Sequence, residues 1–318
     1  MQSYRQYLRD LPQFLAEEEQ ATEDASQCSH LETGQPPIAP APNETPSSRT
    51  TMLAWHSVFP SKMEQSAANF FTAMFAWNEV LSSAAQAKIP EPQTKLRTFF
   101  ADSSFSSVLK NITGCDAWIL GSIMDVTALE VSKRHQLSNG SLSVRGLVSQ
   151  ASKIEAALEL QMKKLSRYGI NSQDPYDEFD HDHLPPEQSV RPRILGHAII
   201  IYLNTVVSGA LSGVPEIHQS ICEVLPLWEK LSATPDCKYL TWAYSTTASL
   251  AAGSQRPAFK KFITNTLLLS TGASTLRYFR ASVEECWKEI DRHAPNASNV
   301  PCDWRDMHMR ENMSFIFL

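Results

Sequence analysis

The densest group of residues that could do chemistry is an acidic run with histidines, Asp180–His183. Carboxylate and imidazole ligands together suit zinc or manganese. Adjacent residues on one loop cannot all point at a single ion, and the prolines that follow the run give the segment little rigidity. We therefore expect residues 170–193, which contain the run, to form a mobile acidic loop without a metal site. Tyr176 and Phe179 in this loop also fit a short acidic activation segment, although an ordinary solvated loop is favoured.

Hydrolysis and nucleotide binding lack their usual signatures. The nucleophile of many hydrolases lies in Gly-x-Ser-x-Gly, and the nearest string, Gly209-Ala-Leu-Ser-Gly213, has the wrong spacing. A phosphate site needs a glycine-rich loop that opens a helix, and none of the 11 glycines is arranged in this way. His197 lies in an apolar run, where a core histidine is the common role. We therefore predict a chain that is not an enzyme, with no catalytic residues and no cofactor.

Cysteine spacing and charge argue against a zinc site and against direct DNA contact. The six cysteines are scattered, the closest pair is 15 residues apart, and no Cys-x-x-Cys occurs. We expect neither a disulfide framework nor a compact zinc site. The formal net charge is −6 and no run of five or more Lys or Arg is present, whereas nucleic-acid binders need a basic face. Residues 1–17 have no continuous apolar stretch, so we expect no signal peptide.

The chain divides into a polar N-terminal region and a long helical region. Aromatic and leucine residues from Tyr4 to Leu15 recur at helical spacing and predict a short amphipathic helix over residues 1–19. Residues 20–52 lose this periodicity and gain Pro, Ser, Thr and acids, which predicts a disordered linker. Residues 53–318 are expected to form the helical domain.

Apolar residues repeat at helical spacing through this region. The predicted buried faces comprise Phe70, Phe71, Met74, Phe75 and Leu81; Ile119, Ile123, Val126 and Leu129; Ile154, Leu158, Met162 and Leu165; Ile217, Ile221, Val224, Leu225, Trp228 and Leu231; and Leu276, Phe279, Val283, Cys286, Trp287 and Ile290. Two further helices are expected over residues 240–252 and 257–269. No segment alternates with period two over a useful length, so we predict an all-α fold with almost no strand.

The most apolar run, Ile194–Leu211, has two interpretations. Its apolarity is that of a membrane span. However, the run contains glycines, His197 and Asn204, and it lacks aromatic and basic flanks on both sides. We expect a buried core helix and no membrane contact.

Four segments occur in a fixed order along residues 53–318. They are Phe71-Thr-Ala-Met-Phe-Ala-Trp77-Asn-Glu-Val-Leu81; Gly114-Cys115-Asp116-Ala-Trp118; Tyr239-Leu-Thr-Trp242 leading to Arg256-Pro-Ala-Phe259; and Glu284-Glu-Cys-Trp287-Lys followed by Asp303-Trp304-Arg305-Asp306. In this order they resemble the fungal-specific transcription factor domain, in its second, shorter class, which follows binuclear zinc clusters. The chain departs from that pattern where Ala243 replaces the usual proline and where Thr247-Ala248 replaces Gly-Cys.

The resemblance implies a nuclear transcriptional regulator whose helical domain has no catalytic set. A binuclear zinc cluster needs two Cys-x-x-Cys-x6-Cys units, and the sequence contains none. We therefore expect the chain to act through protein partners, either the transcription machinery or a full-length zinc-cluster relative, with a small-molecule effector left open. The alternatives are a small-molecule-sensing helical module and a helical enzyme whose apolar pocket is lined by Trp242, His197 and Arg256.

Overall fold

The structure, a computed structural model, describes residues 62–90, 93–168, 186–231, 235–269, 274–293 and 300–310. The chain divides into two units, Met1–Val58 and Phe59–Leu318, and every described residue belongs to the second unit. The predicted helix over residues 1–19 and the predicted linker over residues 20–52 lie outside the described residues. So does most of the predicted acidic loop, including the run Asp180–His183. These remain predictions.

The all-α prediction is confirmed for the described residues. They form α3 (Lys62–Gln86), α4 (Gln93–Ala101), α5 (Ser103–Thr113), α6 (Ala117–Ser138), α7 (Val144–Tyr168), α8 (Pro186–Ser208), α9 (Pro215–Lys230), the 3-10 helix η1 (Pro235–Leu240), α10 (Thr241–Ala248), α11 (Arg256–Leu269), α12 (Ser274–Arg292) and α13 (Trp304–Arg310). The extended pairing seen within these residues is a single bridge between Leu211 and Pro301.

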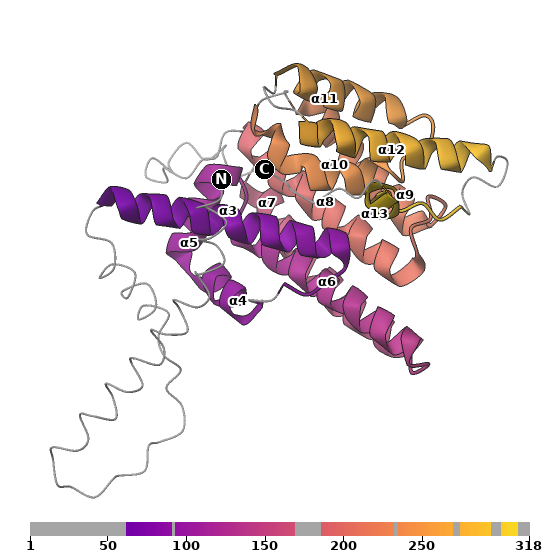
Figure 1. Cartoon of the computed structure of the whole chain (residues 1–318), viewed down its shortest axis with the longest axis horizontal. Helices are drawn as coiled ribbons and strands as arrows, with labels where there is room; N and C mark the ends of the chain where they lie inside the picture. The colour runs from indigo at the N-terminus through magenta and orange to yellow at the C-terminus, as the bar shows by residue number, and fades with distance from the viewer. Residues whose placement is uncertain are drawn as a thin grey trace, which may run out of the picture. The chain divides into compact units, whose positions relative to one another are not determined.

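Helix α8 is the central element of the second unit. It packs against α6, α7, α9 and α10, while α3 packs on α5 and α6, and α12 packs on α10 and α13. Figure 1 shows α3 to α6 on one side of α8, and α10, α11 and α12 on the other. Residues that are distant in the sequence therefore meet around α8, which is where a site that joins the two sides can form.

The apolar run at Ile194 belongs to α8 and lies in the core, as predicted. Ile194, Leu195, Ile199 and Ile201 are fully buried. Among the described helices, none is by itself long and apolar enough to cross a membrane; α5 and α6 meet the length and composition criteria only as a pair, and that pair is bent by 95°.

Periodicity located one helix face well and another poorly. On α12 all six predicted core residues are buried. On α3, however, Phe70 and Phe71 are 44% and 39% exposed, so their predicted burial is wrong. The buried residues of α3 lie from Ala73 onwards, with Ala68 as the exception. The neighbouring helices thus cover only the later turns of α3, a tertiary arrangement that periodicity does not report.

Helix α8 begins at Pro186, within the segment 170–193 that was predicted to be a loop. Residues 186–193 are therefore helical, and the predicted loop boundary is wrong there. Proline suits the first helical position because it has no backbone N–H, and an N–H at this position would have no intrahelical acceptor. Apolar periodicity does not predict these first turns, because their composition is polar and the buried hydrophobic residues of α8 begin only at Ile194.

The Gly114-Cys115-Asp116 segment makes the sharp turn between α5 and α6. Gly114 adopts φ 75°, the left-handed region, and its N–H donates to the carbonyl of Lys110 at 2.8 Å, which ends α5. Cys115 is fully buried, and burial raises the pKa of its thiol to about 12. A thiol that stays protonated is not a nucleophile, so Cys115 serves packing.

Candidate functional site

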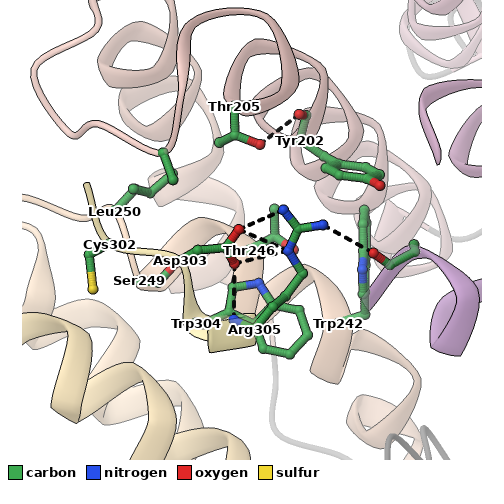
Figure 2. A pocket seen from close by; sticks show the side chains of 12 residues that line it. Tyr202, Thr205, Trp242, Thr246, Ser249, Leu250, Cys302, Asp303, Trp304 and Arg305 are labelled. Atoms are coloured by element: carbon green, nitrogen blue, oxygen red, sulfur yellow. Dashed lines mark hydrogen bonds and ion pairs between the residues drawn. The ribbon is translucent and has the colours of Figure 1, made fainter. Parts of the chain in front are cut away.

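The Asp303-Trp304-Arg305 segment lies against the helical core and carries the most connected group of buried polar residues described. The approach to it is fixed by backbone contacts: the N–H of Cys302 donates to the carbonyl of Ala210 at 2.9 Å. Trp304 is 4% exposed and packs edge to face on Phe279 of α12, with 5.6 Å between ring centroids. These contacts hold the segment in place so that the next side chain points inward (Figure 2).

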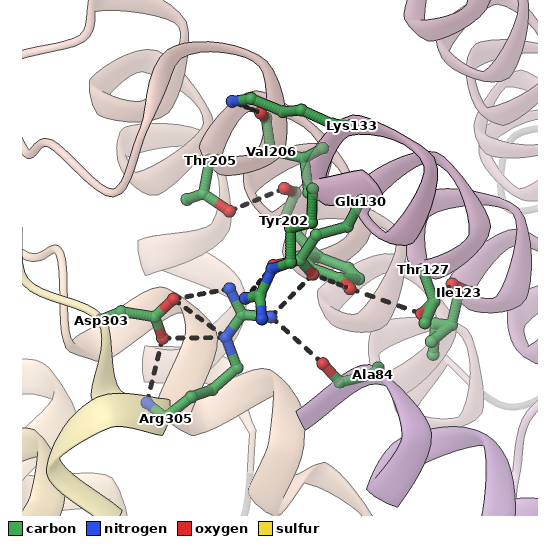
Figure 3. Close-up of polar contacts among 11 residues, drawn as sticks. Ala84, Ile123, Thr127, Glu130, Lys133, Tyr202, Thr205, Val206, Asp303 and Arg305 are labelled. Atoms are coloured by element: carbon green, nitrogen blue, oxygen red, sulfur yellow. Dashed lines mark hydrogen bonds and ion pairs between the residues drawn. The ribbon is translucent and has the colours of Figure 1, made fainter. Parts of the chain in front are cut away.

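Arg305 joins three parts of the fold. Its guanidinium donates to Asp303 at 2.9 Å, to Glu130 of α6 at 2.8 Å, and to the backbone carbonyl of Ala84 at the end of α3 at 3.1 Å. The arginine side chain is 12% exposed and that of Glu130 is 7% exposed. Figure 3 shows the guanidinium between Asp303 on one side and Glu130 and Ala84 on the other.

Glu130 is held from two more directions. The hydroxyl of Tyr202 on α8 donates to it at 2.6 Å, and Arg134, one turn further along α6, pairs with it at 2.7 Å. The Arg305 guanidinium also lies over the Tyr202 ring, 5.4 Å from its centroid. We call Glu130, Tyr202, Asp303 and Arg305 the Arg305 junction.

The electrostatics of the junction keep Arg305 charged and Tyr202 protonated. Burial lowers the pKa of the Arg305 guanidinium, but the charges of Asp303 and Glu130 and their hydrogen bonds outweigh it, so the net direction is upward. Burial, followed by the charge of Glu130, raises the pKa of Tyr202. Arginine thus remains a cation and tyrosine remains a hydrogen-bond donor. With its charges paired and its donors used, the junction resembles a brace more than a reactive centre.

A small cavity adjoins the junction. It is lined by Tyr202, Trp242, Cys302 and Arg305 among others, and measures about 20 Å³ (Figure 2). That space holds about one water molecule. The rings of Tyr202 and Trp242, which both line it, pack edge to face, with 5.9 Å between their centroids. In this conformation the cavity has no room for a metabolite.

The structure does not bring together the three residues suggested to line an enzyme pocket. Trp242 lines the small cavity, whereas His197 faces Glu223 of α9 at 3.7 Å, which is too long for a hydrogen bond. Arg256 pairs with Asp291 of α12 at 2.7 Å and lies over the ring of Trp287. Within the described ranges, no three His, Cys, Asp or Glu side chains are grouped as metal ligands would be.

The sequence named part of this site and missed the rest. In the sequence, Asp303 and Arg305 belong to a motif that assigns them no role, and Glu130 and Tyr202 belong to none of the four motif segments. A signal for Glu130 existed: it follows Ile123 and Val126 by seven and four residues, so it continues their buried helix face. A carboxylate on such a face needs a partner, although the sequence does not say which.

The described residues form an all-helical domain in which the Asp303–Arg305 segment is hydrogen-bonded to the core through Arg305. The chain belongs to the fungal-specific transcription factor domain family, whose model matches residues 46–318. The ustiloxin B cluster transcription factor ustR of Aspergillus flavus is 32% identical over 281 residues, covering 86% of this chain and 46% of the relative.

Two further relatives extend the comparison. Transcription factor phomR of Diaporthe leptostromiformis is 29% identical over 303 residues, covering 81% of this chain and 46% of its own length. The trichothecene biosynthesis transcription regulator TRI10 of Fusarium sporotrichioides is 26% identical over 195 residues, covering 59% of this chain and 41% of the relative. This chain thus spans less than half the length of these relatives. No solved structure matches it.

Proposed function

We propose that this chain regulates transcription in the fungal nucleus and does so through contacts with other proteins. The observation that carries the proposal is the family match, which runs over residues 46–318 and so includes every described helix. A family of transcription factor domains supplies the regulatory part of the proposal. The partner mechanism rests on physical features of the chain itself.

Charge and cysteine spacing support action through protein partners. The 318 residues carry a formal net charge of −6 and contain no Cys-x-x-Cys. Phosphate backbones attract basic surfaces, and a zinc cluster needs closely spaced thiolates. DNA contact would then come from residues outside these 318 or from another protein, such as a zinc-cluster relative. The helical domain would contribute regulation.

The regulated genes, on this proposal, belong to a biosynthetic pathway. The support is that two relatives are named for such gene sets, one for the ustiloxin B cluster and one for trichothecene biosynthesis. The identity of 32% to the first of these relatives covers most of this chain but does not specify the product. The proposal therefore extends to the class of genes and not to a particular metabolite.

The site favours regulation over catalysis. The Arg305 junction has paired charges and a tyrosine whose raised pKa keeps it protonated, and the cavity beside it holds about one water. Both carboxylates of the junction are already bonded to Arg305, and the cavity has no room for a substrate. A small-molecule effector would have to bind elsewhere or open the domain.

A reporter assay tests the proposal. The full 318-residue chain is fused to a foreign DNA-binding domain and expressed with a reporter gene that carries the matching sites. The DNA-binding domain alone gives the baseline, and a fusion carrying Arg305→Ala tests whether the effect needs the folded domain. We expect reporter transcription to change with the intact fusion and to return toward baseline with the variant. An unchanged reporter, together with a pull-down that recovers no nuclear protein, would show that the proposal is wrong.

A further inference from the structure

A groove lies between α11 and α12, away from the Arg305 junction. These helices lie side by side at one edge of the second unit (Figure 1). The groove between them measures about 430 Å³ and is lined by Thr264, Leu267 and Leu268 of α11 and by Arg277, Arg280, Ala281 and Glu284 of α12. We call this surface the α11–α12 groove. It shares no lining residue with the cavity beside the junction.

Leu268 gives the groove an exposed apolar side chain. It is 80% exposed, more than any other leucine among the described residues. Lys261 and Thr264 precede it by seven and four residues, so all three lie on one face of α11. A single exposed leucine is ordinary on a protein surface and by itself means little. The charges around it distinguish this one.

The groove is flanked by two cations, Lys261 and Arg277, that have no ion-pair partner among the described residues. Helix α11 contains Arg256, Lys260 and Lys261 and no acidic residue. Lys261 and Arg277 form no ion pair with any residue that the structure describes, whereas Arg280 is paired with Glu284 at 2.8 Å.

The acidic residues of α12 are already in use within the two helices. Asp291 pairs with Arg256 at 2.7 Å, Glu285 pairs with Lys288 at 3.0 Å, and Glu289 pairs with Arg292. The unneutralised charge beside the groove is therefore positive, in a chain whose formal net charge is −6. A positive rim around an apolar centre fits a partner of opposite pattern.

We propose that the α11–α12 groove docks an amphipathic helical segment of a partner protein, with apolar anchors flanked by carboxylates. The apolar face of such a helix would cover Leu267 and Leu268, and its carboxylates would pair with Lys261 and Arg277. An amphipathic helix contacts a groove through its apolar side chains at positions i, i+3, i+4 and i+7. A surface about two helical turns long accommodates these side chains. The inference rests on the proposed function and names the surface through which a partner would be engaged.

Binding of a designed peptide to the purified full chain tests the groove. The probe is a fluorescein-labelled amphipathic helical peptide of about 16 residues, with leucines at the anchor positions and glutamates on both flanks. A matched peptide carries lysines in place of the glutamates. Fluorescence anisotropy is measured with the wild-type chain and with Leu268→Ser and Arg277→Glu. The matched controls on α7 are Leu160→Ser and Arg145→Glu, whose parent side chains are also exposed.

We expect the glutamate-flanked peptide to bind the wild-type chain, and each groove variant to weaken it by about 10-fold, because each loses an anchor or a charge pair. The α7 controls should stay within about 2-fold of wild type. Arg277→Glu should also bind the lysine-flanked peptide better than the wild-type chain does. This compensation cannot result from misfolding, and circular dichroism confirms that each variant is as helical as the wild type.

Three results would overturn the proposal. They are equal binding of both peptides by the wild-type chain, equal weakening by groove and α7 variants, and self-association of the chain that Leu268→Ser abolishes. The last result would identify a second copy as the occupant. If peptide binding fails while the reporter still responds, the groove is wrong and the proposed function stands. If peptide binding succeeds while the reporter and pull-down are silent, the proposed function is wrong.

Discussion

Arg305 of α13 donates a hydrogen bond to Glu130 of α6 at 2.8 Å, although 175 residues separate the two in sequence. The same guanidinium nitrogen also donates to the carbonyl of Ala84 in α3. A contact of such long sequence separation has to offset the entropy of closing a long loop. The Arg305 junction therefore links the C-terminal segment to helices at the other end of the domain.

Replacing Arg305 should destabilise the domain strongly. Arg305→Ala leaves the buried carboxylates of Glu130 and Asp303 short of a partner, and breaking a buried pair costs about 3 kcal/mol. Arg134 and Tyr202 still contact Glu130, which keeps the loss from being larger. Urea unfolding followed by tryptophan fluorescence measures the change.

The control for this prediction is Arg292→Ala. Arg292 pairs with Glu285 and Glu289, but its side chain is 58% exposed. Exposed pairs contribute about 0–1 kcal/mol. Equal destabilisation by the two variants would contradict a brace at Arg305.

Removing one hydroxyl should also be measurable. Tyr202→Phe keeps the ring between Arg305 and Trp242 but removes the donor to Glu130, which lies at 2.6 Å. A buried charged acceptor that loses a donor costs about 2 kcal/mol. Thermal unfolding should therefore show a lower Tm, whereas Tyr278→Phe, at a position 41% exposed, should leave Tm almost unchanged. The role of the hydroxyl would be refuted if Tyr202→Phe matched the wild type.

Gly114 should be sensitive to any added side chain. Its φ of 75° lies in the left-handed region, so Gly114→Ala is expected to cost about 1 kcal/mol of unfolding free energy. Gly114→Asn should cost less, because asparagine tolerates this region better. Gly253 offers the matched control, since its backbone is not left-handed and nothing lies within 4 Å of an added Cβ. Gly253→Ala should be close to neutral in the same urea titration.

Acidification should weaken the domain partly through His197. Burial lowers the pKa of this histidine below its ordinary 6.5, and this effect exceeds the opposing one of Glu223, while Arg193 lowers the pKa further. The folded pKa is therefore below the unfolded one. As pH falls through the unfolded value, the unfolded chain binds the proton first, so stability is lost toward acid and is complete above that value.

His197→Gln should accordingly flatten the dependence of unfolding free energy on pH between roughly 7 and 5, where histidine titrates. His135→Gln, at an exposed position, is the matched control. A slope that does not change in His197→Gln, or that changes equally in both variants, would show that burial of His197 does not govern the pH response.

Local patterns predicted a helix such as α12 well because it buries one face and exposes the other. The stripe from Leu276 to Ile290 in α12 is buried in full. The same reasoning failed for Phe70 and Phe71 because, among the described residues of α3, burial begins mainly at Ala73. Periodicity gives the apolar face of a helix and does not give the length over which that face is covered.

The Arg305 junction could not be predicted from local sequence patterns, for a different reason. Its charges come from α6 and from the C-terminal segment, and no spacing rule connects Glu130 to Arg305. The sequence showed Asp303-Trp304-Arg305 only as a motif in a resemblance. The residues' function as a brace follows from three-dimensional contacts, namely the bonds of Arg305 to Asp303, Glu130 and Ala84.

Transcript levels in the fungus that carries this gene test most directly the proposed regulation of biosynthetic genes. RNA sequencing would compare a strain lacking the gene, the same strain complemented with the wild-type gene, and the strain complemented with Arg305→Ala. We predict that a coordinated set of biosynthetic transcripts changes on deletion, returns with the wild-type gene, and returns poorly with the variant. Transcript profiles that are the same in all three strains would contradict the claim.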